Sequence, residues 1–318
     1  MKVWQAQNQT IELKEIELPQ ITGNQVLVKI KAFGLNRADL AQIAGSYPPP
    51  AGVTQTLGLE FAGVVEQSFE GSQFQKGDRV MALVQGGAYA QYAVCEEELL
   101  LKIPDQMDFI TAASLPEAWC TVLLNLKRVS TVKKGMRVLL HASTGSVGSA
   151  AIKYARYCGA YVMATTRTAD KKAFLTSIGA HEALLFDELL AQVDRIKNSG
   201  GVDMILDPIG QNSFEVNQKL LNQDGSLVII GNMSGVQAQL NIGLLLVKRQ
   251  KIIGSTLRSQ PLLIRAQVIQ DLAQIMPMIE SGQLSMPVAK VFEWAQTQEA
   301  LNYMDHNHNL GKIIVALK

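Results

Sequence analysis

Alternation of apolar and polar residues marks the first third of the chain as rich in β-strands. Within residues 25–33, Val26, Val28 and Ile30 fall on one face, a spacing of two that is typical of a half-buried strand. Turn signals at Gly77-Asp78 and Gly86-Gly87 separate further short β runs, which cover residues 58–66, 79–84 and 88–95. Strands at this spacing, with few helical stretches, predict a small barrel-like β domain.

From Pro116 onward the pattern changes to helices alternating with strands. Helical stretches are expected at 116–130, 148–158, 170–179, 187–198 and 214–221. Strands are expected at 136–143, 160–166, 183–186, 202–207, 226–231 and 251–256. The strands are nearly all apolar, as in a parallel sheet that helices cover on both faces. This pattern predicts a doubly wound α/β domain of the nucleotide-binding type.

The last part of the chain returns to mixed elements. It predicts a helix over 262–281 that Gly282 ends, a strand over 288–294, a helix over 297–306 and a strand over 312–317. We expect this tail to complete the first domain. The prediction is then one domain from residues 1–118 and 257–318, with the nucleotide-binding domain, residues 119–256, inserted into it.

Composition narrows the class of protein. The chain has 318 residues, 47% of them hydrophobic and 18% charged, which is enough for two packed cores of about 150 residues each. A net charge of +1 gives no basic excess for a nucleic-acid partner. Three cysteines without a CxxC pair argue against a disulfide scaffold and against a thiolate zinc cluster.

No segment has the pattern of a targeting or membrane-spanning sequence. The N-terminal residues lack the apolar run of a signal peptide, and the longest apolar stretches, such as 240–247, fall far short of the ~20 residues that span a bilayer. We therefore expect a soluble, cytoplasmic protein with no membrane partner.

Residues 141–150 (HASTGSVGSA) follow a predicted strand and open a predicted helix, as a Rossmann glycine loop does. Ser143, Gly145 and Gly148 occupy the glycine positions of G-x-G-x-x-G, with serine in place of the first glycine. Gly145 would let the backbone approach a pyrophosphate at the helix N-terminus, and Gly148 would let the helix pack closely. The alternative is a glycine turn that binds no ligand.

The end of the second strand of this domain indicates which dinucleotide binds. NAD enzymes place an acidic residue there for the ribose 2′-hydroxyl, whereas this chain has Arg167, followed by Lys171 and Lys172. A guanidinium and an ammonium group suit a phosphate monoester, so we predict NADPH. The alternative is that these cations are the solvated start of the next helix.

Several segments together resemble the zinc-free quinone oxidoreductases of the medium-chain dehydrogenase/reductase superfamily, and among them the tumour-suppressor-inducible branch. They are GLNRADLAQIAGSYPPP (34–50), LGLEFAGVV (57–65), GDRVMAL (77–83), LPEAWCTV (115–122), the STGSVG loop and NLGKIIV (309–315). The resemblance covers essentially the whole chain. It implies an α/β protein with a GroES-like, β-rich catalytic domain, built from both ends of the chain, and a doubly wound Rossmann domain with a parallel sheet.

The resemblance also implies a site without metal. Zinc alcohol dehydrogenases of the superfamily carry Cys-His where this chain has Asn36-Arg37, and Gly-His-Glu where it has Gly58-Leu59-Glu60. Asparagine and leucine do not replace a thiolate and an imidazole on Zn²⁺. Reduction of a quinone or a conjugated enone spreads negative charge over a conjugated oxygen, so a few hydrogen-bond donors can suffice.

The family pattern assigns the residues of the site. Tyr47 and Asn36 would line it near the nicotinamide, Tyr47 donating to the acceptor oxygen and Asn36 orienting the substrate or the cofactor amide. Alternatively, Tyr47 packs against the neighbouring prolines and Asn36 braces its own loop. The resemblance places further residues near the cofactor: Thr121 at the nicotinamide ribose; Gly145, Ser146 and Val147 at the pyrophosphate; Gly231, Asn232 and Met233 beside the carboxamide; and Lys312 near the cleft.

These observations predict an NADPH-dependent reductase that transfers hydride to quinones. Two alternatives remain open: a reductase of α,β-unsaturated carbonyls, such as 2-alkenals or enoyl thioesters, and a cofactor-binding protein with little turnover. Residues 251–256 resemble the edge strand through which these enzymes pair their sheets, so we expect a homodimer.

Overall fold

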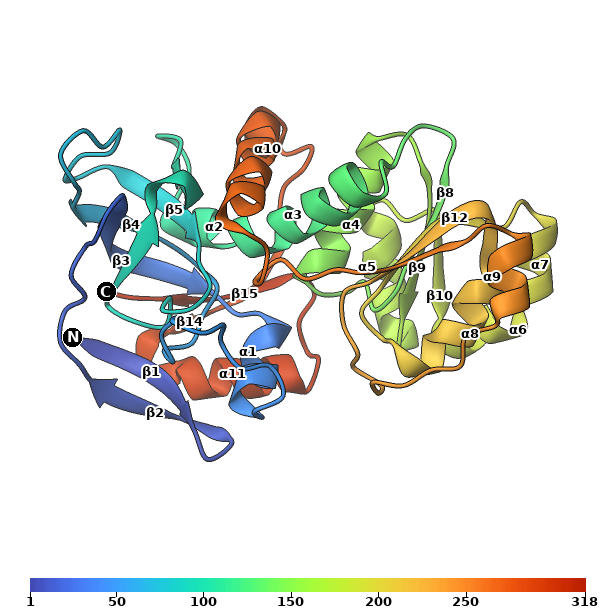
Figure 1. The fold of residues 1–318 in the computed structure, drawn as a ribbon, viewed down its shortest axis with the longest axis horizontal. Coiled ribbons are helices and arrows are strands. Elements are labelled where there is room, and N and C mark those ends of the chain that lie inside the picture. Colours follow the sequence, from blue (N-terminus) through green and yellow to red (C-terminus); the bar gives the residue numbers. More distant parts are fainter. The chain divides into compact units, whose positions relative to one another are not determined.

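The computed structural model describes residues 1–318 and divides into two compact units. The β-rich unit comprises Met1–Cys120 and Arg258–Lys318, and the parallel-sheet unit comprises Thr121–Leu257. Figure 1 shows both units and labels many of their helices and strands. Each unit has its own buried core, so each is described by itself.

The β-rich unit is built on a seven-stranded sheet in the order β14-β15-β3-β4-β5-β7, with β6 also paired to β3. Most neighbours are antiparallel, and only β14 and β15 run parallel. The strands are β3 Gln25–Gly34, β4 Glu60–Gln67, β5 Arg79–Leu83, β6 Tyr92–Glu96, β7 Leu100–Lys102, β14 Val288–Glu293 and β15 Lys312–Ala316.

Strand β3 lies where the sequence predicts it. Val26, Val28 and Ile30 are almost wholly buried and Lys29 is exposed, but Leu27 is buried as well, so the second face of the strand is also partly covered. Strand β15, from the C-terminal end of the chain, pairs antiparallel with β3, and Ile314 lies opposite Gly34. This pairing brings the polar residues that follow β3 close to the polar residue that begins β15, within the β-rich unit.

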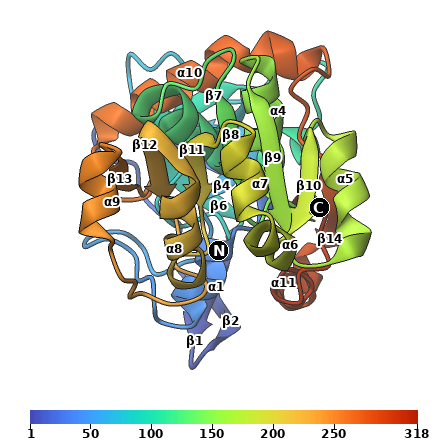
Figure 2. The ribbon, with the colours of Figure 1, turned by 90° about the vertical axis from the view of Figure 1, so that its right-hand side faces the viewer.

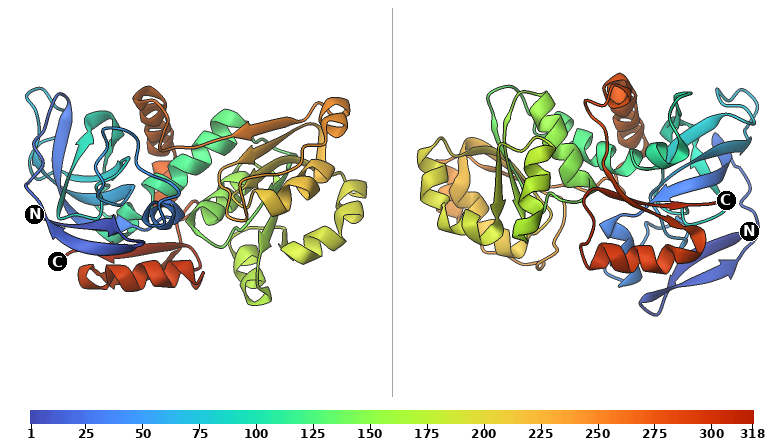
Figure 3. Two further views of the ribbon diagram at one scale, coloured as in Figure 1. Left: turned by 60° about the horizontal axis from the view of Figure 1, so that its bottom comes forward. Right: turned by 180° about the vertical axis from the view of Figure 1, so that it is seen from behind.

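A two-stranded hairpin and five helices complete the β-rich unit. The hairpin, β1 Lys2–Gln7 with β2 Thr10–Glu15, was not among the predicted elements. Helix α11 runs alongside β15 in both views of Figure 3. The helices are α1 Arg37–Ile43, α2 Phe109–Ala113, α3 Pro116–Val122 (which ends just beyond the division between the units), α10 Leu262–Glu280 and α11 Thr297–Asp305. Helix α10 ends before Gly282, whose φ of 85° lies in the left-handed region that glycine adopts readily.

The parallel-sheet unit has six strands in the order β10-β9-β8-β11-β12-β13, and all neighbours are parallel. Counted from β8, this is the order 3-2-1-4-5-6 of the doubly wound dinucleotide-binding fold, which confirms the predicted fold class. The strands are β8 Arg137–Leu140, β9 Tyr161–Thr166, β10 Glu182–Leu185, β11 Val202–Asp207, β12 Leu221–Ile229 and β13 Lys251–Gly254.

Helices lie on both sides of this sheet, as Figure 2 shows. They are α4 Ser146–Tyr157, α5 Lys172–Ser177, α6 Phe186–Ala191, α7 Val193–Asn198, α8 Gln211–Leu220 and α9 Ile242–Val247. The predicted helix over 187–198 is two helices, because the backbone of Gln192 leaves the helical region at φ −108° and ψ 15°. The predicted helix over 116–130 is α3 followed by a π-type helix, Leu123–Val129.

Candidate functional site

The glycine loop of the parallel-sheet unit joins β8 to α4. Gly145 is the N-cap residue of α4, and no side chain caps the first turn of this 12-residue helix. A Cβ atom on Gly148 would lie 2.3 Å from Cα of Ser143, so only glycine permits this approach of helix and loop. The close packing predicted for Gly148 is confirmed, and the uncapped N–H groups of the helix remain available to an anion.

Ser143 replaces the first glycine of the loop without disturbing it. Its side chain is fully buried, and Oγ donates to the carbonyl oxygen of Leu140 at 2.8 Å. Its backbone N–H donates to the carbonyl oxygen of Thr165 at 2.9 Å. The loop is thus tied to the ends of both β8 and β9.

A chain of buried polar side chains fixes the start of the loop. Asn217 Nδ2 donates to Asp207 Oδ2 at 2.8 Å, so its Oδ1 accepts from His141 Nε2, also at 2.8 Å. His141 Nδ1, 3.1 Å from Thr165 Oγ1, then accepts from that hydroxyl, and Thr165 Oγ1 accepts the N–H of Ala142 at 3.2 Å. Burial lowers the pKa of His141, so the imidazole is neutral. His141 is therefore a structural residue with both nitrogens satisfied.

The cations predicted to select the dinucleotide follow β9. Arg167 is exposed and makes no hydrogen bond or ion pair with the chain. Lys171, in a short 3₁₀ turn, is half-buried. Lys172 is paired with Glu188 at 2.8 Å, so its ammonium group is committed within the unit. Arg167 is the cation whose surroundings leave it available to a phosphate.

The remaining residues carried over from the family lie on loops and helix starts. Ser146 and Val147 open α4, and Thr121 lies near the end of α3. Gly231, Asn232 and Met233 follow β12, and a Cβ on Gly231 would meet the carbonyl oxygen of Pro208 at 2.9 Å. The contacts of these residues with a cofactor stay predictions.

The β-rich unit holds a group of buried ionisable side chains, which we call the carboxylate cluster: Asp39, Glu60, Glu117 and Lys312, together with Asn36. The side chains of Lys312 and Glu60 are 0% exposed and form an ion pair. Lys312 Nζ also donates to Asn36 Oδ1 at 2.7 Å, and Asn36 Nδ2 donates to Glu60 Oε1 at 2.9 Å. Both ends of the Asn36 amide are thereby occupied, an arrangement that favours the bracing role for its side chain.

Asp39 extends the cluster into helix α1. Its Oδ2 accepts the backbone N–H of Asn36 at 2.7 Å and the hydroxyl of Tyr89 at 2.9 Å. The ring of Tyr89 is buried and stacks on Phe33 with ring centres 4.3 Å apart. Burial outweighs these hydrogen bonds and raises the pKa of Asp39 to about 6.

Glu117 adds a third carboxyl group, at the start of helix α3. Its backbone N–H donates to Glu60 Oε2 at 2.9 Å, so Glu60 caps the first turn of the helix. Burial, and then the negative charge of Glu60, raise the pKa of the Glu117 side chain to about 8. Its residue surface is only half-buried, in contrast to the surfaces of Asp39 and Glu60.

Tyr47 lies in the loop after α1 and is half-buried. The guanidinium carbon of Arg258 lies 5.4 Å from the centre of its ring, a cation–π contact. Arg258 is itself fixed, since Nε donates to the Gln85 carbonyl oxygen at 2.6 Å and Nη2 donates to Gln42 Oε1 at 2.8 Å. The tyrosine ring is thus held by an arginine that the sequence did not single out.

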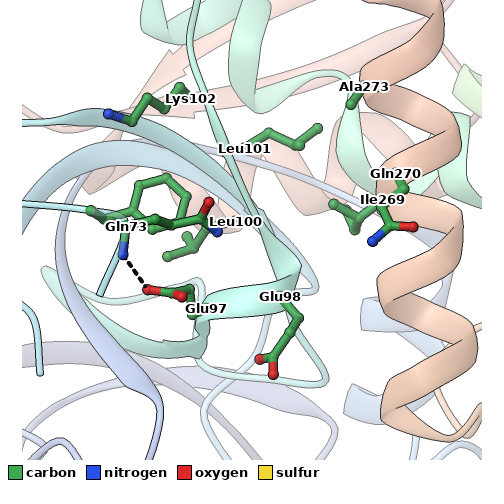
Figure 4. A pocket seen from close by; sticks show the side chains of 10 residues that line it. Gln73, Glu97, Glu98, Leu100, Leu101, Lys102, Ile269, Gln270 and Ala273 are labelled. Atoms are coloured by element: carbon green, nitrogen blue, oxygen red, sulfur yellow. Dashed lines mark hydrogen bonds between the residues drawn. The ribbon is translucent and has the colours of Figure 1, made fainter. Parts of the chain in front are cut away.

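A separate pocket of the β-rich unit lies between β7 and α10, and Figure 4 shows it. Ile269, Gln270 and Ala273 of α10 form one wall. Glu97 faces the other side, where its carboxylate accepts the backbone N–H of Gln73 at 3.0 Å. None of the predicted site residues lines this pocket.

Sequence reasoning did not assign site roles to Glu60, Glu117, Asp39 and Arg258. The available signal was a charged residue at the start of an otherwise apolar strand: Glu60 in EFAGVV and Lys312 in KIIVA. A buried charge needs a partner, so two such strands predict an ion pair without saying which strands meet.

Family models match both units. Residues 22–105 match "Alcohol dehydrogenase GroES-like domain" and residues 146–280 match "Zinc-binding dehydrogenase". A GroES-like β-rich domain with a doubly wound dinucleotide fold defines a medium-chain dehydrogenase/reductase. No three His, Cys, Asp or Glu side chains are grouped so that they could hold a metal ion, and no helix combines the length and apolar character needed to cross a membrane.

Individual relatives narrow the class further. Quinone oxidoreductase from Lama guanicoe is 30% identical over 311 residues, 96% of this chain and 92% of the relative. The chain belongs to the quinone oxidoreductase family of this superfamily. Among solved structures, quinone oxidoreductase from Escherichia coli complexed with NADPH has a TM-score of 0.89 at 24% identity and covers 99% of both chains. JamJ enoyl reductase in its apo form shares the fold, with a TM-score of 0.89 at 23% identity over 100% of this chain and 99% of that one.

Proposed function

We propose that the protein is an NADPH-dependent reductase that transfers hydride to quinones without a metal ion. The observation that carries the proposal is the sequence similarity to a quinone oxidoreductase over 96% of the chain. By the resemblance, Asn36 and Leu59 stand at ligand positions of the zinc enzymes, and the ammonium group of Lys312 pairs with the buried Glu60 carboxylate. A site occupied in this way offers hydrogen-bond donors rather than a Lewis acid.

The parallel-sheet unit has the features that NADPH requires. The glycine loop leaves no room for a Cβ at position 148, and the uncapped start of α4 offers N–H groups and a positive helix end to a pyrophosphate. Arg167 and Lys171 would hold the 2′-phosphate, with Gly145, Ser146 and Val147 at the pyrophosphate. The Escherichia coli relative, crystallised with NADPH, supports this choice of cofactor.

The reduced nicotinamide supplies the hydride when it is bound. Thr121 would contact its ribose, and Gly231, Asn232 and Met233 would flank its carboxamide. Tyr47, held by Arg258, would donate a hydrogen bond to the acceptor oxygen. Asn36 would act by fixing its loop and bridging Lys312 and Glu60, and Lys312 would act by neutralising Glu60 and holding the Asn36 amide.

A reductase of α,β-unsaturated carbonyls is the second candidate. A hydrogen-bond donor without a metal serves an enone oxygen as well as a quinone oxygen. The shared fold of JamJ enoyl reductase is compatible with it. Parallel assays with a quinone and with a 2-alkenal, both with NADPH, separate the two.

We further propose a homodimer formed through strand β13. This strand is the edge of the parallel sheet, and its outer side has no partner strand in the chain. The nearby segment exposes large apolar side chains that a second copy would cover: Val236, Ile242, Leu246 and Val247 are 69–79% exposed.

The Arg167→Glu variant tests the choice of cofactor. It removes a charge-assisted contact and sets a carboxylate against the 2′-phosphate, so NADPH affinity should fall by about 2 kcal/mol, roughly 30-fold. NADH, which lacks that phosphate, should bind as before. Titration calorimetry with both nucleotides measures the difference, and Lys197→Glu, at an exposed position of α7, is the control. Equal losses for the two nucleotides would refute the assignment of Arg167.

The Tyr47→Phe variant tests the acceptor site. Loss of the hydroxyl should lower kcat with quinone and leave the affinity for NADPH unchanged, because the ring still packs against Arg258. Unchanged kcat would reduce Tyr47 to a packing residue.

A further inference from the structure

The carboxylate cluster contains more carboxyl groups than its cations can neutralise. Asp39, Glu60 and Glu117 share one buried ammonium group, that of Lys312, and the charge of Arg258 acts on two of them. Ionising all three carboxyl groups would leave net negative charge in a largely water-free site, which is costly. The cluster therefore holds at least one proton near neutral pH.

Hydrogen bonds decide which carboxyl group is ionised. Glu60 forms the ion pair with Lys312 and accepts from Asn36 Nδ2 at 2.9 Å and from the backbone N–H of Glu117 at 2.9 Å. These donors stabilise its carboxylate form. Asp39 accepts from Tyr89 and from the N–H of Asn36, and burial raises its pKa only to about 6. The proton therefore resides on Glu117, whose pKa lies near 8.

Glu117 is also the member of the cluster that can exchange its proton. Asp39 is 1% exposed and Glu60 is 0% exposed, whereas Glu117 retains accessible surface. Its charged neighbours come from four other segments: Glu60 on β4, Asp39 on α1, Lys312 on β15 and Arg258. Cys120, one turn further along α3, stays a neutral thiol because burial raises its pKa well above the usual value.

Two features connect Glu117 to the proposed acceptor site. Arg258, whose charge acts on Glu117, is the residue that holds the ring of Tyr47. Thr121, the proposed contact of the nicotinamide ribose, follows Glu117 by four residues on helix α3, and this spacing puts the two on one helix face.

We propose that Glu117 is the proton donor to the reduced acceptor, and that its burial beside the carboxyl groups of Glu60 and Asp39 keeps it protonated while Lys312 is engaged in the ion pair with Glu60. The inference rests on the proposed function. The acceptor takes a hydride from the reduced nicotinamide. This hydride is one proton carrying two electrons. As the acceptor oxygen gains negative charge, the O–H bond of the Glu117 carboxyl group breaks and an O–H bond forms at that oxygen. The Glu117 carboxylate then regains a proton from water.

Glu117→Gln removes the acidic proton and keeps the shape of the side chain. Single-turnover oxidation of NADPH by a quinone should slow about 10²-fold, the usual contribution of a general acid. The wild-type rate should fall as the pH rises through about 8, and this fall should be absent in the variant. Glu117→Asp, which keeps an acid, should recover part of the rate. Glu280→Gln, at an exposed position of α10, is the matched control and should behave as wild type.

An infrared titration provides a readout that does not require turnover. The stretching band of a protonated carboxyl group should disappear from the wild-type spectrum near pH 8 and should be missing from the spectrum of Glu117→Gln. Loss of that band near pH 4.5 in the wild type would overturn the proposal. If the wild-type protein turns over a quinone and Glu117→Gln keeps the wild-type single-turnover rate and pH profile, proton donation by Glu117 is refuted. The proposed function is not refuted by this result. No turnover of any quinone or enone by the wild-type protein would refute the proposed function, and this step with it.

Discussion

Removing the buried cation of the carboxylate cluster should destabilise the β-rich unit severely. In Lys312→Met, the Glu60 carboxylate keeps its donors from Asn36 and Glu117 but loses its counter-ion in a site where both side chains are 0% exposed. Breaking a buried ion pair on one side costs about 3–5 kcal/mol. The Oδ1 atom of Asn36 loses its only donor as well, which adds about 1 kcal/mol.

Urea unfolding monitored by tryptophan fluorescence measures this loss. Trp4, Trp119 and Trp294, the three tryptophans of the chain, all belong to the β-rich unit, so their emission reports on that unit. Lys76→Met breaks an exposed pair with Glu66 and should leave the transition unchanged.

The double variant Glu60→Gln/Lys312→Met separates a lost ion pair from lost packing. Neither charge remains in it, so it should be less destabilised than the sum of the single variants, by roughly 2 kcal/mol or more. A loss below about 1 kcal/mol in Lys312→Met, or strict additivity in the cycle, would refute the reasoning.

Three further predictions concern the glycine loop, the proposed dimer surface and Glu117. Gly148→Ala should cost about 1–3 kcal/mol and weaken NADPH binding, since its Cβ would stand 2.3 Å from Cα of Ser143; thermal unfolding and calorimetry test this. Ile242→Asp/Leu246→Asp should yield monomers in light scattering with unchanged circular dichroism, and an unchanged mass would contradict the dimer surface. The folded-state pKa of Glu117 is raised from 4.5 to about 8, so the folded protein binds more protons between these values and its stability falls as the pH rises through that range. Glu117→Gln should flatten this dependence in urea titrations, and an unaltered slope would contradict it.

The sequence predicted elements well where one local pattern decides the structure. The alternation of Val26, Val28 and Ile30 predicted β3, and strand–helix alternation predicted the parallel sheet. The hairpin of β1 and β2 was missed because only Val3 and Ile11 of its side chains are buried, which gives too little alternation to read. Helix α9 was missed because its sequence, IGLLLV, has no polar positions and therefore shows no amphipathic period.

The candidate site also has parts that the sequence predicted and parts that it missed. Gly148 was predictable because the constraint on it comes from Ser143, five residues away in the same loop. The pairing of Lys312 with Glu60 and Asn36 was not, because it depends on β15 lying beside β3, a contact between residues more than 270 positions apart. The raised pKa of Glu117 has the same origin, since it depends on burial and on charges from four separate segments.

Steady-state oxidation of NADPH and of NADH by the wild-type protein, with a quinone as acceptor, tests the central claim most directly. We expect quinone-dependent oxidation of NADPH, with a kcat/KM well above that for NADH. Turnover of a 2-alkenal but of no quinone, or a preference for NADH, would contradict the proposed function.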